Sequence, residues 1–487
     1  MEAIEMQIEA LLYTIRPYGN TRIEKLPQSG GDRIYFRVFY NDETLIATWN
    51  NHVQENKTFI HFSRHFKQLD LPVPVIYAVN EEYTIYIQED VGTTSLLDVL
   101  EQQGQNEYVY SLFQQSLGEL ARLQIKGHEG MNYNVCLTAK AFGKQAILSD
   151  LLYFKYYFLD TLKLPYDKQV MLEDFENISS FLADATYSYF MFRDFQSRNI
   201  IVHNGKVHFI DYQGGMQGAL QYDVASLLWQ ARAGLSAEWK ESLLHHYIAE
   251  ANKLLSAPVN KTLFVQRFNG YVLLRLLQVL GAYGFRGLFE RKAHFLTSIP
   301  LALRNLKWFV LNQMQLGFEA REFTRVLELI VQEDIISRFE NVQATEATPL
   351  VVEINSFSYK KGIPGTTSGH GGGFVFDCRG LLNPGRFEEF KTSCGMDKNV
   401  QHFLEERTRM NEFLNSVYNL VDISIEDYIQ RSFESLTISF GCTGGQHRSV
   451  YAAEQTARHL KNKYKVKVDI KHLNQENWVK EKVLSVS

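Results

Sequence analysis

Short runs of apolar, β-branched and aromatic residues, separated by polar segments, open the chain and predict β-strands. These runs cover residues 34–40, 44–49 and 83–89. Between the second and third runs, residues 56–69 have the composition of a helix. The pattern therefore predicts a small mixed lobe over residues 1–92, ended by Gly92 at an expected hinge.

Residues 93–335 are mainly helical in pattern, with apolar side chains at helical spacing over 273–280 and 323–336. Asp223 stands directly before a short apolar run, which is a good N-cap position. The polar segment 336–349 is predicted to be a linker.

After the linker, short apolar strands alternate with helical stretches. Predicted strands cover residues 351–354, 374–377, 436–440 and 465–470, and predicted helices cover 398–420 and 449–461. Alternation of this kind implies a small α/β domain with a largely parallel sheet over residues 350–487.

One predicted strand pair carries candidate chemistry. The Asn-Gly dipeptide at 204–205 lies between two β-branched runs and predicts a tight hairpin, because both residues tolerate positive φ. In the register that this turn sets, Asn199 lies opposite Ile210, so Asn199 and Asp211 meet at the open end. With Asp194 close by, these side chains offer the oxygen ligands that Mg²⁺ prefers. The alternative is a hairpin that merely begins and ends with polar residues.

The chain has 487 residues, enough for two or three domains, with a formal net charge of −5 and 22% charged residues. This composition shows no bias toward nucleic acid or membranes. No apolar run approaches the ~20 residues of a membrane span, and the acidic N-terminus lacks a signal-peptide core. Four scattered cysteines without a CxxC pair disfavour a zinc knuckle and fit a reducing cytoplasm. We therefore expect a cytoplasmic protein without a membrane partner.

Residues 192–199 read Phe-Arg-Asp-Phe-Gln-Ser-Arg-Asn, and residues 210–214 read Ile-Asp-Tyr-Gln-Gly. The pattern R-D-x-x-x-x-N followed by Asp is typical of kinase-like catalytic loops, although Phe192 stands where His is usual. With the further segments 29–38 and 89–92, and with 222–227, the first 335 residues resemble the aminoglycoside phosphotransferase and choline kinase superfamily. They look most similar to bacterial kinases that phosphorylate the anomeric hydroxyl of N-acetylmuramate and N-acetylglucosamine in peptidoglycan recycling.

This resemblance implies an α+β bilobal protein-kinase-like fold, with ATP and Mg²⁺ as cofactors and an amino sugar as the small-molecule substrate. Asp194 would be the catalytic residue, and Asn199 and Asp211 would bind the metal. Arg193 and Asp223 would be structural residues of the active site. The nucleotide-binding residues would be Gly30, Gly31, Arg33, Arg37, Glu89 and Val91.

The chain departs from the superfamily at residues 45–49, a strand that usually carries the ATP-binding Lys and has none here. Arg33 or Arg37 would then supply the positive charge. Glu55 is a candidate acid of the small lobe, and a solvated carboxylate at a helix start is an equally good interpretation. The alternative for the whole domain is a pseudokinase that binds nucleotide and turns over poorly.

A second motif, Gly-Cys-Thr-Gly-Gly-Gln-His-Arg-Ser at 441–449, follows a predicted strand and opens a predicted helix. Glycines in this position expose consecutive N–H groups and make an anion site, to which His447 and Arg448 add charge. Cys442 and Arg448 also have the C-x₅-R-S spacing of cysteine phosphatases. The favoured interpretation makes Cys442 a packed small residue.

Residues 350–475 resemble the C-terminal domain of the RNase adapter protein RapZ. The resemblance is carried by the segments 356–364, 375–379, 382–384, 394–397 and 441–455. It implies a phosphofructokinase-like domain that senses glucosamine-6-phosphate, a phosphorylated amino sugar, and contributes to RNA binding. The phosphosugar-binding residues would be Asp377, Arg379, Asn383, Thr443, Gly444, Gly445, His447 and Arg448.

Two further segments leave alternatives open. The glycine-rich insertion 365–373 is either a lid or phosphate loop, or a flexible connector. Lys461, Lys463, Lys465 and Lys467 alternate, which predicts a basic stripe on an extended segment. RNA is a possible partner of this stripe, and a solvated edge strand is the favoured interpretation.

Together the sequence predicts an amino-sugar kinase fused to a phosphosugar-binding or phosphosugar-sensing domain. No GxxxxGK[ST] motif occurs, so the kinase-like segment takes the place of the RapZ P-loop domain. The alternatives are a regulatory nucleotide-binding pseudokinase whose C-terminal domain binds RNA or a protein partner, and a Cys442-dependent phosphatase.

Overall fold

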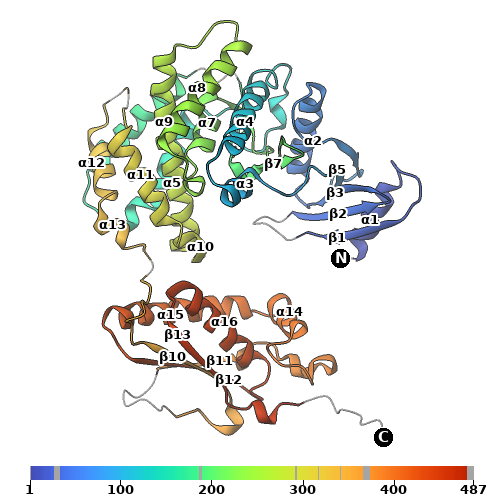
Figure 1. Cartoon of the computed structure of the whole chain (residues 1–487), viewed down its shortest axis with the longest axis vertical. Coiled ribbons are helices and arrows are strands. Elements are labelled where there is room, and N and C mark those ends of the chain that lie inside the picture. Colours follow the sequence, from blue (N-terminus) through green and yellow to red (C-terminus); the bar gives the residue numbers. More distant parts are fainter. Residues whose placement is uncertain are drawn as a thin grey trace. The chain divides into compact units, whose positions relative to one another are not determined.

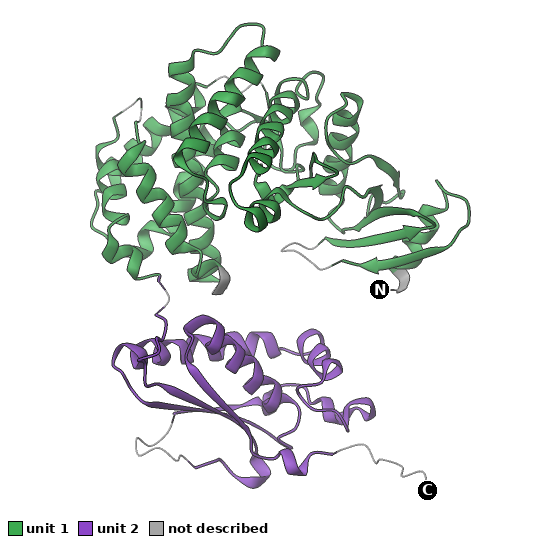
Figure 2. Ribbon diagram, viewed as in Figure 1, with its two compact units in different colours: residues 1–339 green, residues 340–487 purple. Residues whose placement is uncertain are grey.

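The computed structural model describes residues 2–26, 33–185, 189–290, 293–315, 317, 319–340, 342–365 and 373–479. The chain divides into two compact units, Met1–Phe339 (unit 1) and Glu340–Ser487 (unit 2), which Figure 2 shows in different colours. Each unit has its own hydrophobic core.

The small lobe of unit 1 is an antiparallel sheet with the strand order β1-β2-β3-β5-β4 (Figure 1). Its elements are α1 (Glu2–Leu12), β1 (Thr21–Lys25), β2 (Ile34–Tyr40), β3 (Glu43–Trp49), α2 (Val53–Gln68), β4 (Ile76–Val79) and β5 (Ile85–Glu89). The three predicted strands and the predicted helix are confirmed as β2, β3, β5 and α2. The edge strand β1 was not predicted, because Ile23 is the only apolar residue in it.

The large lobe is helical and encloses two short strand pairs, β6–β9 and β7–β8. Its first elements are α3 (Leu96–Gln103), α4 (Glu107–Ile125), α5 (Lys144–Tyr157), α6 (Lys168–Ala183), β6 (Tyr189–Met191), β7 (Ile200–His203), β8 (Lys206–Phe209) and β9 (Met216–Gly218). The remaining elements are α7 (Leu220–Leu228), α8 (Ala237–Leu254), α9 (Lys261–Tyr283), α10 (Ala293–Leu296), α11 (Ile299–Asn312), α12 (Arg321–Ile330) and α13 (Glu333–Ser337). The helix predicted over 323–336 is therefore two helices, separated at Val331 and Gln332.

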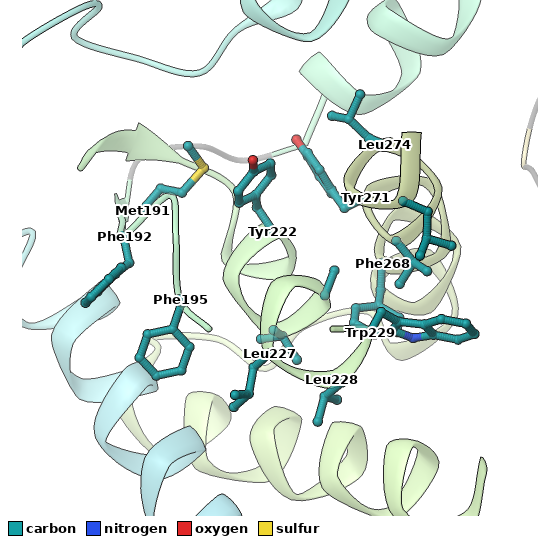
Figure 3. Close-up of a cluster of buried hydrophobic side chains, with 14 of the residues drawn as sticks. Met191, Phe192, Phe195, Tyr222, Leu227, Leu228, Trp229, Phe268, Tyr271 and Leu274 are labelled. Carbon is teal, nitrogen blue, oxygen red and sulfur yellow. The ribbon is translucent and has the colours of Figure 1, made fainter. Parts of the chain in front are cut away.

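Aromatic and aliphatic side chains from β6, α7 and α9 form the core on which the catalytic loop rests. Figure 3 shows Phe192 and Phe195 of the loop near Leu227 and Tyr222 of α7. The rings of Phe192 and Phe195 lie 5.1 Å apart in an edge-to-face arrangement, and both are completely buried. This packing anchors the catalytic loop on the hydrophobic core of the large lobe.

Helix α9 and the π-helical turn Gly284–Phe289 that follows it are long and apolar enough to span a membrane by length and composition. Of its most apolar window, 56% is buried inside unit 1. Burial of this kind is typical of the central helix of a globular domain, because neighbouring helices cover its apolar sides.

Unit 2 is an α/β domain with a fully parallel sheet in the order β11-β12-β10-β13. Its main elements are β10 (Val351–Ser358), β11 (Gly373–Asp377), α14 (Lys398–Arg407), α15 (Met410–Gln430), β12 (Ser435–Cys442), α16 (Arg448–Tyr464) and β13 (Lys467–His472). The predicted α/β class and parallel sheet are confirmed. The predicted helix over 398–420 is two helices, α14 and α15, and the second continues to Gln430.

The predicted basic stripe does not form as an alternating extended segment. Helix α16 continues to Tyr464, so Lys461 and Lys463 lie in its last turn, and Lys465 is its left-handed C-cap. Lys463 pairs with Asp422 at 2.8 Å. The basic residues therefore point in different directions, because helical and extended segments space their side chains differently.

The expected linker is shorter than predicted. Helix α13 reaches Ser337, and the boundary between the units falls at 339/340. Ala344 donates its N–H to the carbonyl oxygen of Tyr464 at 2.7 Å and packs against the core of unit 2. The glycine-rich segment 366–372 lies outside the described residues.

Candidate active site

The predicted hairpin forms next to the catalytic loop. Strands β7 and β8 pair antiparallel with His203 opposite Lys206, so the predicted register is confirmed. The N–H of Ile210 donates to the carbonyl oxygen of Asn199 at 3.1 Å and continues the ladder past the strand ends. Asn199 therefore lies at the open end of the hairpin together with Asp211, the residue that follows Ile210.

The side chain of Asn199 is oriented by the catalytic loop itself. Its Nδ2 donates to the carbonyl oxygen of Asp194 at 2.9 Å, and the residue is only 7% exposed. Because this hydrogen bond uses the amide nitrogen, the Oδ1 atom remains as the acceptor. An amide oxygen held in this way suits a divalent cation.

Asp211 adopts a φ of 70°, which is uncommon for a residue other than glycine and is concentrated at functional sites. Its Oδ1 accepts hydrogen bonds from Gln213 Nε2 at 2.8 Å and from Arg33 Nη1 at 3.4 Å. The side chain of Asp211 is 40% exposed. Within the described ranges, no group of three or more His, Cys, Asp or Glu residues gathers as a metal site. The amide oxygen of Asn199 and the carboxylate of Asp211 remain the candidate metal ligands at this end of the hairpin.

The two candidate arginines of the small lobe are placed differently. Arg33 bridges Asp211 and Glu55, forming an ion pair with each, and its side chain is 11% exposed. Arg37 instead donates to both carboxylate oxygens of Asp90, at 2.8 and 3.3 Å, beside the hinge. The structure thus brings Arg33 to the predicted metal ligand. It also shows that Glu55 is an engaged residue and not a solvated one.

The remaining predicted nucleotide-binding residues lie at the hinge or outside the described part of the chain. Glu89 ends β5, and its Oε2 accepts a backbone N–H at 3.1 Å. Val91 is 6% exposed, and Gly92 has a φ of 91° that favours glycine. Gly30 and Gly31 lie outside the described residues.

Asp223 fixes the start of the catalytic loop. It lies inside helix α7, whose N-cap is Ala219, so the predicted N-cap role of Asp223 is wrong. Its completely buried carboxylate accepts the N–H of Phe192 at 2.7 Å, the N–H of Arg193 at 3.0 Å, and Gln124 Nε2 at 3.0 Å. Burial raises the pKa of Asp223 to about 6, although these hydrogen bonds favour the ionised form.

Asp194 stands at the mouth of the loop with its side chain 35% exposed. Its Oδ2 lies 3.0 Å from Arg198 Nη2, and its Oδ1 lies 3.5 Å from Arg275 Nη2. Two residues of this site were not predicted from the sequence: Arg275 of α9, and Asp150 of α5, which pairs with Arg193 at 3.2 Å. One signal in the sequence could have pointed to Arg275, which is the single charged residue inside the apolar run of α9. A charge buried in this way needs a partner.

In unit 2, the glycine-rich turn joins β12 to α16 as predicted. Thr443 and Gly444 are exposed at its tip, and a Cβ atom at Gly444 would meet nothing within 4 Å. Gly445 has a φ of 67°, and a Cβ atom there would lie 3.0 Å from the backbone nitrogen of Ser358. Glycine at 445 therefore combines a left-handed conformation with close packing.

The two charged residues of this turn are engaged with the neighbouring loop. Arg448 Nη1 donates to the carbonyl oxygens of Arg379 and Leu381, at 3.1 and 2.7 Å. A ring nitrogen of His447 lies 2.8 Å from the carbonyl oxygen of Phe390. The structure thus brings the turn together with the loop that carries Asp377 and Arg379.

The other predicted residues of this loop are held locally. Asp377 binds Arg379 through both carboxylate oxygens, at 2.9 and 2.6 Å, and Arg379 lies 3.8 Å from the ring centre of Tyr359. Its ion pair with Arg379 lowers the pKa of Asp377. Asn383 Oδ1 accepts the N–H of Gly385 at 3.3 Å. All three therefore shape the loop.

Cys442 lies beneath the turn and is 2% exposed. Its Sγ accepts the N–H of Gly445 at 3.2 Å and lies 3.1 Å from Ser449 Oγ. A phosphatase nucleophile must reach its substrate from an accessible position. The geometry therefore disfavours the phosphatase alternative.

Two family matches agree with this geometry. Residues 24–255 match the phosphotransferase enzyme family, and residues 350–476 match the RapZ C-terminal domain. Unit 1 is thus similar to the phosphotransferase enzyme family, and unit 2 is similar to the RapZ C-terminal domain.

Individual similar proteins match parts of the chain. A nucleotide-binding protein of Shewanella halifaxensis is 38% identical over 128 residues, which are 26% of this chain and 43% of that protein. A nucleotide-binding protein of Fervidobacterium nodosum is 30% identical over 191 residues, 37% of this chain and 65% of that protein. This chain thus spans 43 to 65% of the length of these two curated relatives. The choline kinase of Cryptosporidium parvum aligns with a TM-score of 0.46 and 12% identity, over 66% of this chain and 99% of that one.

The buried carboxyl of Asp223 should make the free energy of unfolding depend on pH. Its folded pKa of about 6 exceeds the ordinary 3.8, so the folded chain keeps a proton that the unfolded chain releases between these values. Stability from this group is therefore present below pH 4 and lost as pH rises through 6, by about 3 kcal/mol. We expect the difference in unfolding free energy between the wild type and Asp223→Asn to fall by that amount from pH 4 to pH 7, in urea titrations followed by Trp fluorescence.

Asp184→Asn is the control, because the side chain of Asp184 is 83% exposed. It should leave the pH dependence unchanged. A wild-type minus Asp223→Asn difference that is constant across the pH range would contradict the raised pKa.

Gly445→Ala should destabilise unit 2 by about 1–2 kcal/mol, because alanine at positive φ is strained and its Cβ atom meets the backbone of Ser358. Gly444→Ala is the matched control next to it and should change stability by less than about 0.5 kcal/mol. Urea unfolding of both variants checks this, and equal stabilities would show that the turn relaxes freely.

Proposed function

We propose that unit 1, a domain of the phosphotransferase enzyme family, transfers the γ-phosphoryl group of ATP to a hydroxyl of an amino sugar such as N-acetylmuramate or N-acetylglucosamine. We propose further that unit 2 binds a phosphorylated amino sugar as a sensor. The arrangement of Asp194, Asn199 and Asp211 around the catalytic hairpin carries the first proposal. Both sequence resemblances point to cell-wall amino sugars, and this motivates the choice of acceptor and a cytoplasmic setting.

Each of these side chains has one task in the proposed transfer. Asp194 would accept the proton of the attacking hydroxyl, and its partial exposure leaves it accessible. Asn199 Oδ1 and the Asp211 carboxylate would hold Mg²⁺. When bound, the metal would neutralise negative charge on the phosphates. Asp223 keeps the loop that carries Asp194 in place through two backbone hydrogen bonds.

The contacts of Arg33 favour an active kinase over the pseudokinase alternative. In protein kinases, a Lys of the small-lobe sheet pairs with a Glu of the neighbouring helix and contacts the phosphates. Here Arg33 directly precedes β2 and pairs with Glu55 of α2, while its Nη1 reaches Asp211. The positive charge that β3 lacks is thus supplied from the start of the adjacent strand. Arginine also binds phosphate in a bidentate way that lysine does not.

Several features of unit 2 support the proposal for a phosphosugar. Thr443 and Gly444 form an exposed turn directly before helix α16, whose first N–H groups favour anions. Arg448 and His447 are committed to the neighbouring loop, so their role in this proposal is to shape the turn. Paired lysines in α16 and β13 give no support to RNA as the favoured partner.

Asp194→Asn should abolish most phosphoryl transfer, with kcat reduced by about 10²- to 10⁴-fold, because the hydroxyl loses its proton acceptor. The assay measures ADP release from Mg·ATP with N-acetylglucosamine or N-acetylmuramate as acceptor. Asp184→Asn, on the exposed surface of the same unit, should keep wild-type activity. Wild-type protein without turnover on either sugar, or an active Asp194→Asn variant, contradicts the proposal.

Arg33→Met should raise KM for ATP and lower kcat, with a combined loss in kcat/KM of about 10- to 100-fold, because a buried charge beside the phosphates is removed. Arg37→Met is the matched control, since Arg37 is bound to Asp90 at the hinge. It should cost less than about threefold. A larger loss from Arg37→Met than from Arg33→Met would reverse this assignment.

A further inference from the structure

Ser197 occupies the middle of the catalytic loop, between Asp194 and Asn199. It begins the single 3₁₀ turn Ser197–Asn199, and it is completely buried. The N-cap of this turn, Gln196, makes no capping hydrogen bond through its side chain. The N–H groups at the start of a helical turn have no acceptor within the turn, and a buried N–H needs one. The N–H of Ser197 therefore depends on an acceptor from elsewhere.

Gln230 supplies this acceptor from another part of the fold. Its Oε1 accepts the backbone N–H of Ser197 at 3.0 Å and the hydroxyl of Ser197 at 2.7 Å. A backbone N–H can only donate, so the atom that faces it must be the amide oxygen of Gln230 and not the amide nitrogen. Among the described residues, no other side chain outside the loop hydrogen-bonds to the backbone of residues 195–198. One glutamine thus holds the middle of the loop with two hydrogen bonds.

The backbone of Gln230 is itself held on both sides. The preceding residue, Trp229, is 3% exposed, and its carbonyl oxygen accepts Asn305 Nδ2 of α11 at 2.9 Å. The indole of Trp229 also meets the ring of Phe309, another residue of α11, edge to face at 5.2 Å. On the other side, the carbonyl oxygen of Gln230 accepts the N–H of Ala233 at 3.1 Å. Gln230 is therefore a rigid support and not a mobile surface residue.

A displacement of Ser197 would act mainly on Asn199, the last residue of the same turn. The side chain of Asn199 reaches back across the loop to the carbonyl oxygen of Asp194 at 2.9 Å, so its orientation depends on the backbone between these two residues. Asp194 has a support of its own, because Asp223 accepts the N–H groups of the two residues that precede it. The two hydrogen bonds of Gln230 thus bear chiefly on the candidate metal ligand.

We propose that Gln230 is a positioning residue for the metal end of the catalytic loop. By holding Ser197, it keeps the amide of Asn199 in the orientation that presents its oxygen as an acceptor. Metal sites tolerate little displacement of their ligands, and loss of a residue that orients a ligand commonly weakens metal binding by about 10- to 100-fold. The inference rests on the phosphoryl transfer proposed above and adds a residue on which its metal binding depends.

The test compares how nucleotide binding by full-length variants depends on Mg²⁺. Calorimetry measures the affinity for a non-hydrolysable ATP analogue at rising Mg²⁺ concentrations, and the half-saturating Mg²⁺ concentration is the readout. Gln230→Met removes the acceptor at similar length and should raise this concentration about tenfold. KM for the acceptor sugar at saturating Mg²⁺ should change by less than about threefold, because Asp194 keeps its own support.

Two further variants separate the lost hydrogen bonds from a general disturbance of the loop. Gln230→Glu keeps an oxygen acceptor for both bonds and should stay within about twofold of the wild-type Mg²⁺ dependence. Ser197→Ala loses only the hydroxyl bond and should raise the half-saturating Mg²⁺ concentration by about fourfold. In the Gln230→Met background the same substitution should add nothing further, because its partner is already absent.

Gln105→Met is the matched control. Gln105 Oε1 accepts the backbone N–H of Ser236 at 3.0 Å, which is a bond of the same kind in the same unit but outside the catalytic loop. The variant should keep the wild-type Mg²⁺ dependence and turnover. A shift as large as that of Gln230→Met would show that the effect is not specific to the loop and would overturn the inference.

Other outcomes also decide against it. An unchanged Mg²⁺ dependence in Gln230→Met contradicts the inference, and a loss of kcat without that shift assigns Gln230 to Asp194 instead. If Gln230→Met does not fold, Ser197→Ala decides, since a fourfold shift supports the inference and no shift refutes it. Wild-type protein that binds the analogue but turns over no sugar contradicts the proposed transfer, while the binding series still tests Gln230. Analogue binding by the wild type that is independent of Mg²⁺ contradicts both.

Discussion

The buried carboxylate of Asp223 is the constraint on which the catalytic loop depends. One side chain of α7 accepts the N–H groups of two successive residues, Phe192 and Arg193, and Arg193 adopts a φ of 80° that its type rarely takes. These bonds set the position of Asp194, and the carbonyl oxygen of Asp194 in turn orients the amide of Asn199. Burial without partners would cost several kcal/mol, so the three donors around Asp223 are what make the arrangement stable.

The distribution of arginines explains how this site differs from a typical kinase site. The sheet of the small lobe has no lysine at the usual strand, and Arg33, directly before the neighbouring strand β2, reaches Glu55 and Asp211. On the other side of Asp194, Arg275 is locked by Tyr222 and Gln278. Arginine side chains from both lobes therefore reach the acidic residues of the site.

In unit 2, Arg448 and His447 of the glycine-rich turn bind the neighbouring loop. Arg448 ties α16 to the loop at 379–381 through two carbonyl oxygens, and His447 is tied to Phe390. Gly445 allows the turn to pass close to Ser358. The exposed part that remains, Thr443 and Gly444 before a helix N-terminus, offers backbone N–H groups and not charged side chains. This arrangement underlies the proposal that the turn binds the phosphate of a sugar.

The sequence by itself determined three strands of the small lobe (β2, β3 and β5), the register of the hairpin at 204–205 and the parallel α/β class of unit 2. All of these follow from local patterns, because turn chemistry and side-chain periodicity act over a few residues. The sequence did not reveal that Asp223 lies inside a helix, that α16 extends through Lys461 and Lys463, or that Arg33 and not Arg37 meets Asp211. Nor did it indicate that Arg275 of α9 faces Asp194. Only the tertiary structure decided these contacts, because the partners of a buried charge come from distant segments whose approach is set by the packing of whole helices.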